Sequence, residues 1–350
     1  MTPKRKVGKK KKKLQKLNIA CWNMRSLVED DGSLETGRVR QDERASKGSV
    51  EKKAVLMVWE LKRYNIFVAG ISEMKWFGNN IYEVEDHVIL HSGRKLPDEG
   101  DEIRRGEGVG IVLSPNAAEA WRDGGEQWEP VNSRIVTARL RLRVGKRAKY
   151  LSIVSVYAPT FHSPQQDKDD FYADLQSVVE GISEEDVLVV LGDWNARVGS
   201  KQEDDEWDGV LGKHGLGRMN EAGLFLLSFC GMNCLSIMNT LFEKKDIHKQ
   251  SWQHPGTKKW HCIDYILMRQ NQRKLCSDAQ VMRGAECWSD HRMVRAKLLL
   301  NFRPPKRSKS AAPKQLNMCD LRSQNVQAKF NDKLTNLLNQ SWSDCGSAQK

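Results

Sequence analysis

The feature that most constrains the fold is a series of short apolar runs separated by segments with helical periodicity. "IFVAGI" (66–71) and "VLVVLG" (187–192) contain no charged or amide side chain, and such strands need cover on both faces. "RIVTARLRLRV" (134–144) alternates with period two and places Arg139, Arg141 and Arg143 on one face, which predicts an antiparallel, half-exposed strand. Both strand types, with helices between them, predict an α/β sandwich of two sheets flanked by helices.

The same reading assigns the individual elements. The expected strands are 17–23, 66–73, 108–114, 134–144, 150–159, 187–195, 262–268 and 293–300. The expected helices are 50–64, 168–180 and 221–230, where apolar residues recur on one helical face. Residues 28–49 are polar and have no periodicity, so we expect a long surface loop there.

Charge divides the chain into three parts. The net charge is +12, but residues 1–16 carry nine Lys/Arg and no acid, and residues 301–350 carry nine Lys/Arg against three Asp. We therefore predict a basic tail (1–16), a faintly acidic folded domain (17–300) and a basic Pro/Ser/Lys linker with a short helical segment (301–350). This distribution excludes a histone-like protein with a wholly positive surface.

The basic tail admits two interpretations. A lysine-rich tract of this kind has no apolar face and cannot fold alone, so it is either a solvated tail or an arm for nuclear import or nucleic-acid contact. The functional interpretation places nucleic-acid contacts at Lys9, Lys10, Lys11, Lys12 and Lys13.

Other sequence features exclude several protein classes. No run approaches ~18 apolar residues, so no transmembrane helix is expected, and no apolar stretch follows the N-terminal charges as in a secretory signal. The eight cysteines form no CxxC pair, which argues against a disulfide scaffold or a zinc site. We expect reduced, mostly buried thiols in a nuclear protein, with the cytoplasm as a second compartment.

Polar side chains stand where apolar strands end. Asn23, Glu73, Tyr157, Asp193 and Asn195 all occupy such positions. Strand ends gather around clefts in layered α/β folds. Period-two alternation in "GDWN" puts Asp193 and Asn195 on one face; the alternative reading of this segment is a simple Asx turn.

A carboxylate also interrupts an apolar strand in "HCIDYILM". Asp264 must find a cation or hydrogen-bond donors there, because an unpaired buried charge is strongly unfavourable. "CWSDHRMV" supplies His291, with Asp290 beside it. An Asp that orients an imidazole and stabilises its protonated form is a working part of several hydrolases.

Taken together and in order, "CWNMRSL", "ISEMKW", "SVYAPT", "LGDWNARVG", "IDYIL" and "WSDHRMV" resemble the motifs of the endonuclease/exonuclease/phosphatase superfamily over residues 17–300. "HGLGRMNEAG", "HPGTKKWHCIDYI" and "CWSDHR" look most like the endonuclease domains of LINE/non-LTR retrotransposons and craniofacial development protein 2-like proteins. The resemblance implies a DNase I-like, four-layered α/β sandwich with two mixed β-sheets.

The resemblance also implies a function. It suggests a retrotransposon-derived, metal-dependent phosphodiesterase that acts as a DNA endonuclease and leaves a 3′-hydroxyl at the nick. DNA is the expected partner of a monomer without a membrane association or small-molecule cofactor. Oxygen ligands favour Mg²⁺ or Mn²⁺. The implied metal ligands are Asn23, Glu73 and Asp290, and the implied catalytic residues are Tyr157, Asp193, Asn195, Asp264 and His291.

One position departs from the repair-endonuclease branch. That branch carries an aspartate two residues after the first-strand asparagine, where this chain has Arg25, so abasic-site specificity is not expected. Two alternatives remain open. The first is a noncatalytic, domesticated or remnant nuclear DNA- or chromatin-binding protein, and the second is a phosphatase or RNase of the same superfamily.

Overall fold

A computed structural model describes residues 15–28, 52–95, 106–144, 147–200 and 206–300. They lie within one compact unit, Met1–Pro305. The predictions for the lysine tract, for nearly all of the 28–49 loop and for the 301–350 segment concern residues outside the described ranges. The first strand, β1 (Gln15–Asn23), begins two residues inside the range assigned to the basic tail.

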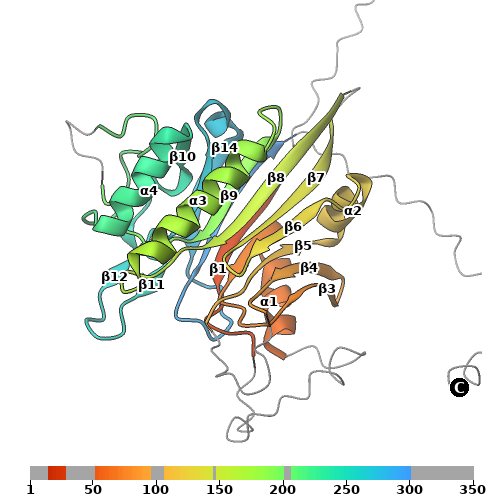
Figure 1. Cartoon of the computed structure of the whole chain (residues 1–350), viewed down its shortest axis with the longest axis horizontal. Coiled ribbons are helices and arrows are strands. Elements are labelled where there is room, and N and C mark those ends of the chain that lie inside the picture. Colours follow the sequence, from red (N-terminus) through yellow and green to blue (C-terminus); the bar gives the residue numbers. More distant parts are fainter. Residues whose placement is uncertain (1–14, 29–51, 96–105, 145–146, 201–205, 301–350) are drawn as a thin grey trace, which may run out of the picture. The chain divides into compact units, whose positions relative to one another are not determined.

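Two mixed sheets form the centre of the fold (Figure 1). The seven-stranded sheet has the order β14-β15-β1-β2-β5-β4-β3, and its strands after β1 are β2 (Ile66–Ser72), β3 (Asn79–Val84), β4 (His87–Ser92), β5 (Val109–Leu113), β14 (Cys276–Met282) and β15 (Met293–Leu300). The six-stranded sheet has the order β10-β13-β9-β8-β7-β6, with β6 (Trp128–Asn132), β7 (Ile135–Val144), β8 (Arg147–Tyr157), β9 (Val187–Asp193), β10 (Leu235–Ile237) and β13 (Asp264–Arg269). The pairs β1–β2 and β8–β9 are parallel, and the other paired strands are antiparallel.

Strand β9 explains why some strands are apolar throughout. Val189 and Leu191 belong to the core between the two sheets, whereas Leu188 and Val190 belong to the core under the helices. Each face therefore removes apolar surface from water, at roughly 25 cal/mol per Å². Gly70 of β2 permits the close approach of the sheets, because a Cβ there would lie 2.0 Å from Leu191 Cδ1.

Helices cover the outer face of each sheet. Helix α1 (Lys52–Arg63) packs Met57, Val58 and Leu61 against the seven-stranded sheet. Helices α3 (Gln165–Gly181) and α4 (Glu221–Met232) cover the six-stranded sheet on the opposite side (Figure 1). Helix, sheet, sheet and helix make four layers, which confirms the predicted fold class.

Several elements were not predicted. Strand β4 is wholly buried although His87 and His91 interrupt its apolar pattern. Helix α2 (Pro115–Asp123) is short, but its Ser114 N-cap and first-turn proline were readable start signals. The remaining additions include the strands β3, β6, β10 and β14 and a small hairpin of β11 (Trp252–Gln253) and β12 (Trp260–His261). In the described part of the chain, no helix is long and apolar enough to cross a membrane.

The cysteine prediction holds for the described residues. Six cysteines lie there, all of them are free, and only Cys234 is exposed.

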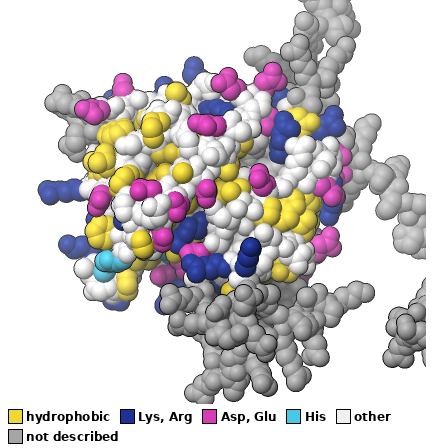
Figure 2. Space-filling model, viewed as in Figure 1, with side chains coloured by type: hydrophobic (Ala, Val, Ile, Leu, Met, Phe, Trp, Pro, Cys, Tyr) yellow, Lys and Arg dark blue, Asp and Glu magenta, His cyan; other side chains and the backbone are white. Residues whose placement is uncertain are grey.

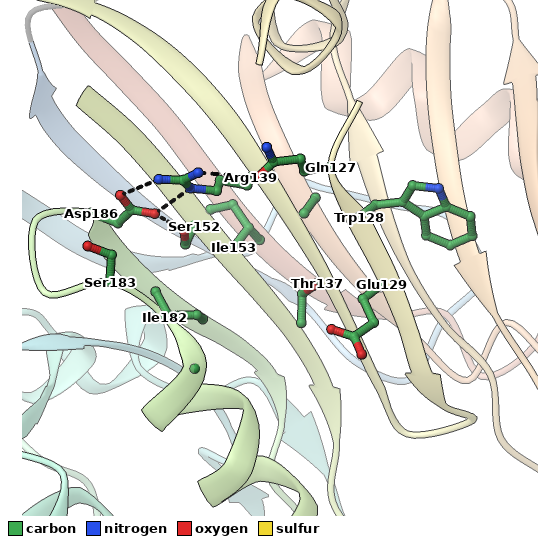
Figure 3. A pocket seen from close by; sticks show the side chains of 12 residues that line it. Gln127, Trp128, Glu129, Thr137, Arg139, Ser152, Ile153, Ile182, Ser183 and Asp186 are labelled. Atoms are coloured by element: carbon green, nitrogen blue, oxygen red, sulfur yellow. Dashed lines mark hydrogen bonds and ion pairs between the residues drawn. The ribbon is translucent and has the colours of Figure 1, made fainter. Parts of the chain in front are cut away.

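Strand β7 is antiparallel to both of its neighbours, as predicted, and Arg139 on its polar face forms an ion pair with the buried Asp186. Arg139 Nε and Nη2 donate to the two carboxylate oxygens of Asp186 at 2.7 and 3.1 Å, and the guanidinium lies 3.7 Å above the ring of Tyr150. This ion pair borders a surface hollow of about 480 Å³ (Figure 3). Because Asp186 precedes β9, the hollow lies at the opposite end of that strand from Asp193.

Candidate active site

The predicted site residues come together at one edge of the two sheets. Asn23 ends β1, Glu73 follows β2, Tyr157 ends β8 and Asp193 ends β9. Asp264 begins β13 directly opposite Asp193 in the antiparallel pair. His291 lies two residues before β15. The convergence expected from the strand-end pattern is therefore present in the structure.

The amide of Asn23 joins the two sheets. Its Nδ2 donates to Glu73 Oε1 and to Asp193 Oδ2, both at 2.8 Å. Its Oδ1 accepts from the backbone N–H of Arg25 at 2.8 Å, which fixes the orientation of the amide. Tyr157 Oη donates to Glu73 Oε1 at 3.1 Å. One hydrogen-bond network thus links residues of both sheets, and Asn23 serves in it chiefly as a donor.

The "GDWN" segment forms the Asx turn given above as the alternative. Trp194 is buried and its indole donates to the carbonyl of Tyr265 at 3.2 Å. The backbone N–H of Asn195 donates to Asp193 Oδ1 at 2.9 Å, which is the Asx turn. The Asn195 amide nitrogen donates to the carbonyl of Ala158 at 2.8 Å. This turn therefore holds Asp193 while the indole anchors the loop.

His291 lies between two buried carboxylates. Its Nδ1 is 3.0 Å from Asp264 Oδ2, and its Nε2 is 3.8 Å from Asp193 Oδ2. Burial by itself lowers the pKa of His291, but the charges of Asp264 and Asp193 outweigh it and raise the pKa to about 9. Burial and the charge of Asp264 raise the pKa of Asp193 to about 7. A cationic imidazole beside a weakly acidic carboxyl is suited to proton transfer near neutral pH.

Asp290 lies beside this network, and its charge contributes to the raised pKa of His291. It is exposed, and its Oδ2 accepts from the indole of Trp252 at 3.3 Å. Among the described residues, the acidic and imidazole groups whose ligand atoms lie within 4.8 Å of one another are instead Asp193, Asp264 and His291.

Sequence reasoning missed the residues that hold the site in place. Ser289 Oγ donates to the carbonyl of Asn23 at 2.6 Å and accepts from the backbone N–H of His291 at 3.1 Å. The serine of "SDH" was the available signal. It connects the loop of His291 to the end of β1.

Arg134 was also missed. Its guanidinium lies 5.2 Å from the centroid of the Tyr157 ring and donates to Glu107 Oε1 at 2.6 Å. Glu107 also accepts from Arg94 and from Ser133 Oγ. No motif marks Arg134, because its role follows from its position just before β7, where its carbonyl accepts from the backbone N–H of Tyr157 at 2.9 Å.

Five of the ten described non-glycine residues with a left-handed φ lie in these loops. Left-handed φ angles occur at Arg25 (58°), Glu73 (53°), Lys75 (59°), Asn195 (47°) and Trp288 (52°). Such angles are uncommon for residues other than glycine. Strained backbone of this kind persists where surrounding contacts over-determine it, and it clusters at functional sites.

Comparisons with known proteins identify relatives in sequence and in fold. No family model matches the chain. Craniofacial development protein 2 from Bos taurus is 36% identical over 285 residues, which is 81% of this chain and 41% of that protein. The homologue from Tragulus javanicus is 35% identical over 285 residues, which is 81% of this chain and 42% of that protein. The chain thus spans about two fifths of the length of the curated relatives it matches.

Solved structures with more distant sequences share the fold. The catalytic domain of Xenopus laevis APE2 superposes with a TM-score of 0.54 at 15% identity, covering 81% of this chain and 93% of that one. The AP endonuclease LMAP from Leishmania major gives 0.52 at 10% identity, covering 81% and 88%. The chain is therefore a sequence relative of craniofacial development protein 2 that shares the DNase I-like fold of these two nuclease structures.

Proposed function

We propose that this chain is a Mg²⁺- or Mn²⁺-dependent DNA endonuclease of retrotransposon origin, which nicks one strand and leaves a 3′-hydroxyl. The observation that carries the proposal is the continuous network from Glu73 through Asn23 and Asp193 to His291. It places two carboxylates, a cationic imidazole and a tyrosine hydroxyl at one edge of the sheets. That combination of groups suits hydrolysis of a phosphodiester, in which charge must be neutralised and water deprotonated.

The oxygen ligands around Glu73 suit a hard cation. Glu73 Oε1 accepts two hydrogen bonds, whereas Glu73 Oε2 lies 3.8 Å from the ammonium nitrogen of Lys75. The ligand atoms of Asp193, Asp264 and His291 lie within 4.8 Å of one another, but His291 would have to lose a proton to ligate a metal there. We therefore assign the cation to Glu73, with the Oδ1 of Asn23 and the exposed carboxylate of Asp290 completing the oxygen donors. When bound, the cation supplies charge neutralisation at the phosphate.

The remaining residues act on water and phosphate. Asp193 accepts the proton of the attacking water, which requires its ionised form. His291 remains cationic at neutral pH and offsets phosphate charge, while Asp264 orients its ring. The Tyr157 hydroxyl acts as a hydrogen-bond donor throughout, since burial raises its pKa far above neutrality. Asn195 shapes the turn that holds Asp193, and its Oδ1 faces no recorded donor among the described residues.

Nicking of supercoiled plasmid tests the proposal directly. The purified chain should convert supercoiled to open-circular DNA with Mg²⁺ or Mn²⁺ and not with EDTA. A DNA polymerase should then extend the nick without end repair, because the product carries a 3′-hydroxyl. Intact plasmid with either metal would contradict the proposal.

Two alternatives remain as outcomes of the same experiment. Hydrolysis of RNA or of a phosphomonoester in preference to DNA would favour a ribonuclease or phosphatase. DNA binding without cleavage would favour a noncatalytic or remnant protein. The intact network argues against decay, because a remnant is free to lose any one of these groups.

Replacing Glu73 with glutamine should weaken metal use more than DNA binding. The amide keeps the shape of the side chain but loses the charge that attracts the cation. The Mg²⁺ concentration for half-maximal nicking should rise by about tenfold or more, the range seen when metal-site interactions are lost. Glu85→Gln, at an exposed turn between β3 and β4, is the matched control. An unchanged Mg²⁺ dependence would remove Glu73 from the ligand set.

We further propose that Lys9–Lys13 contact DNA phosphates and direct the protein to the nucleus. The described surface mixes acidic, basic and apolar side chains on the face seen in Figure 2, so it offers no broad basic platform there. Deleting residues 1–14 should lower DNA affinity and reduce the salt slope by about 0.9 per lost phosphate contact. Fluorescence anisotropy at several salt concentrations measures both. An unaltered slope with cytoplasmic accumulation would leave import as the only role.

A further inference from the structure

Trp288 is an exposed tryptophan in the loop beside the candidate active site. Trp288 is 68% exposed and its backbone φ is 52°. Its backbone N–H donates to Glu286 Oε1 at 2.8 Å. The residue that follows, Ser289, is hydrogen-bonded to Asn23. A tryptophan in left-handed backbone conformation is rare, and a large exposed aromatic forgoes the burial that normally stabilises it. The fold thus fixes the backbone of an exposed tryptophan in the loop that leads into the site.

Cationic groups surround the base of this loop. Cys287 Sγ donates to the carbonyl of Lys53 at 3.5 Å, which places the first turn of α1 against the residue preceding Trp288. Lys53 Nζ donates to the carbonyl of Met24 at 2.7 Å, beside the exposed Arg25. The charges of Arg25 and Lys75 both act on the ammonium group of Lys53 and lower its pKa, after burial as the main cause. Three cations therefore lie close together along this rim.

An exposed aromatic residue in a loop beside several cations suits the binding of unstacked nucleobases. The cations attract the sugar–phosphate backbone, and the ring stacks on a base without reading its sequence. An apolar side chain at this place can also wedge between base pairs and bend the duplex. Neither role is required for hydrolysis, which the network around His291 supplies.

We propose that Trp288 stacks on a nucleobase close to the phosphate that is cleaved, with Arg25, Lys53 and Lys75 holding the adjoining backbone. The proposal rests on the DNA endonuclease function proposed above and adds to it the contact that anchors the strand. It makes Trp288 a source of affinity that salt does not screen, in contrast to its cationic neighbours.

Binding of a labelled DNA duplex to the full chain in EDTA, at several salt concentrations, tests this contact. Trp288→Ala should raise Kd by about 5- to 150-fold, the range for loss of one base–aromatic stack, with an unchanged salt slope. Arg25→Ala should instead reduce the slope by about 0.9. Trp288→Phe should restore most of the affinity because it keeps a stacking face.

Trp59, which is 53% exposed on α1, provides the matched control. Trp59→Ala should bind DNA as the wild type does. Nicking by Trp288→Ala at saturating DNA should stay within about threefold of wild type, since stacking contributes to binding rather than to the chemical step. Unchanged affinity of Trp288→Ala, while the wild type binds and nicks, would overturn this inference alone. A wild type that binds no duplex would overturn the endonuclease proposal with it.

Discussion

His291→Ala is expected to reduce nicking by on the order of 10²- to 10⁴-fold, the usual contribution of a positioned acid, base or charge-stabilising group. The imidazole lies between Asp264 and Asp193, and its charge compensates two buried carboxylates. Removing it leaves Asp193 facing Asp264 without a cation, which further disfavours the ionised form that accepts a proton from water. The rate constant at saturating DNA and Mg²⁺ is the relevant measurement.

The appropriate control is His248→Ala, which removes a partly exposed imidazole from a short 3₁₀ turn. It should nick DNA like the wild type. Circular dichroism should show both variants folded, although His291→Ala leaves buried carboxylates less compensated and should melt at a lower temperature. Activity of His291→Ala within about threefold of wild type would exclude the imidazole from the chemistry.

Much of the site followed from one physical argument applied to the sequence. Because strand ends gather around a common cleft, the carboxylates and the amide at the ends of apolar strands were expected to lie together. The structure places Glu73, Asn23 and Asp193 in one hydrogen-bond network. A buried carboxylate needs a cation, which paired Asp264 with His291, 27 residues away along the chain. These predictions succeeded because each depended on a local pattern and on the energy of an unpaired charge.

Other features depended on tertiary register and were not readable. The donor role of Asn23 is set by the Arg25 backbone, and the link from Ser289 to Asn23 spans 266 residues. Strand β4 was not predicted because its histidines interrupt the apolar pattern. His91 is nevertheless buried, and neither of its ring nitrogens has a hydrogen-bond partner among the described residues. Burial lowers its pKa to about 4, so the ring stays neutral and behaves as an apolar group.

The position of Asp290 illustrates the same limit at the site itself. Its carboxylate accepts from the indole of Trp252, whose ring centroid lies 6.1 Å from that of His291. The ligand role of Asp290 therefore stays a prediction, because a contact with Trp252 does not place its carboxylate beside Glu73. Glu73→Gln compared with Asp290→Asn would show which carboxylate governs the Mg²⁺ requirement.

Asp193→Asn should give the largest loss of activity of any single substitution, approaching 10⁴-fold, because the amide cannot accept the proton of the attacking water. Both carboxylate oxygens of Asp193 are engaged, Oδ1 by the Asn195 backbone and Oδ2 by Asn23. An asparagine amide can keep only one of these two hydrogen bonds. The substitution also removes a buried negative charge beside Asp264. We expect these effects to offset each other, so that stability changes by no more than about 1–2 kcal/mol.

Asp186→Asn should show the opposite pattern and is therefore the most informative control. Asp186 is equally a buried aspartate, but it accepts from Arg139 and Ser152 at the far end of β9. Its substitution breaks a charged pair and should lower the melting temperature while the nicking rate per folded molecule is kept. Measuring both quantities for both variants separates chemistry from packing. If Asp193→Asn retained more than about a tenth of the wild-type rate at saturating Mg²⁺, Asp193 would not be the base. The proton would then have to pass to another group of the network.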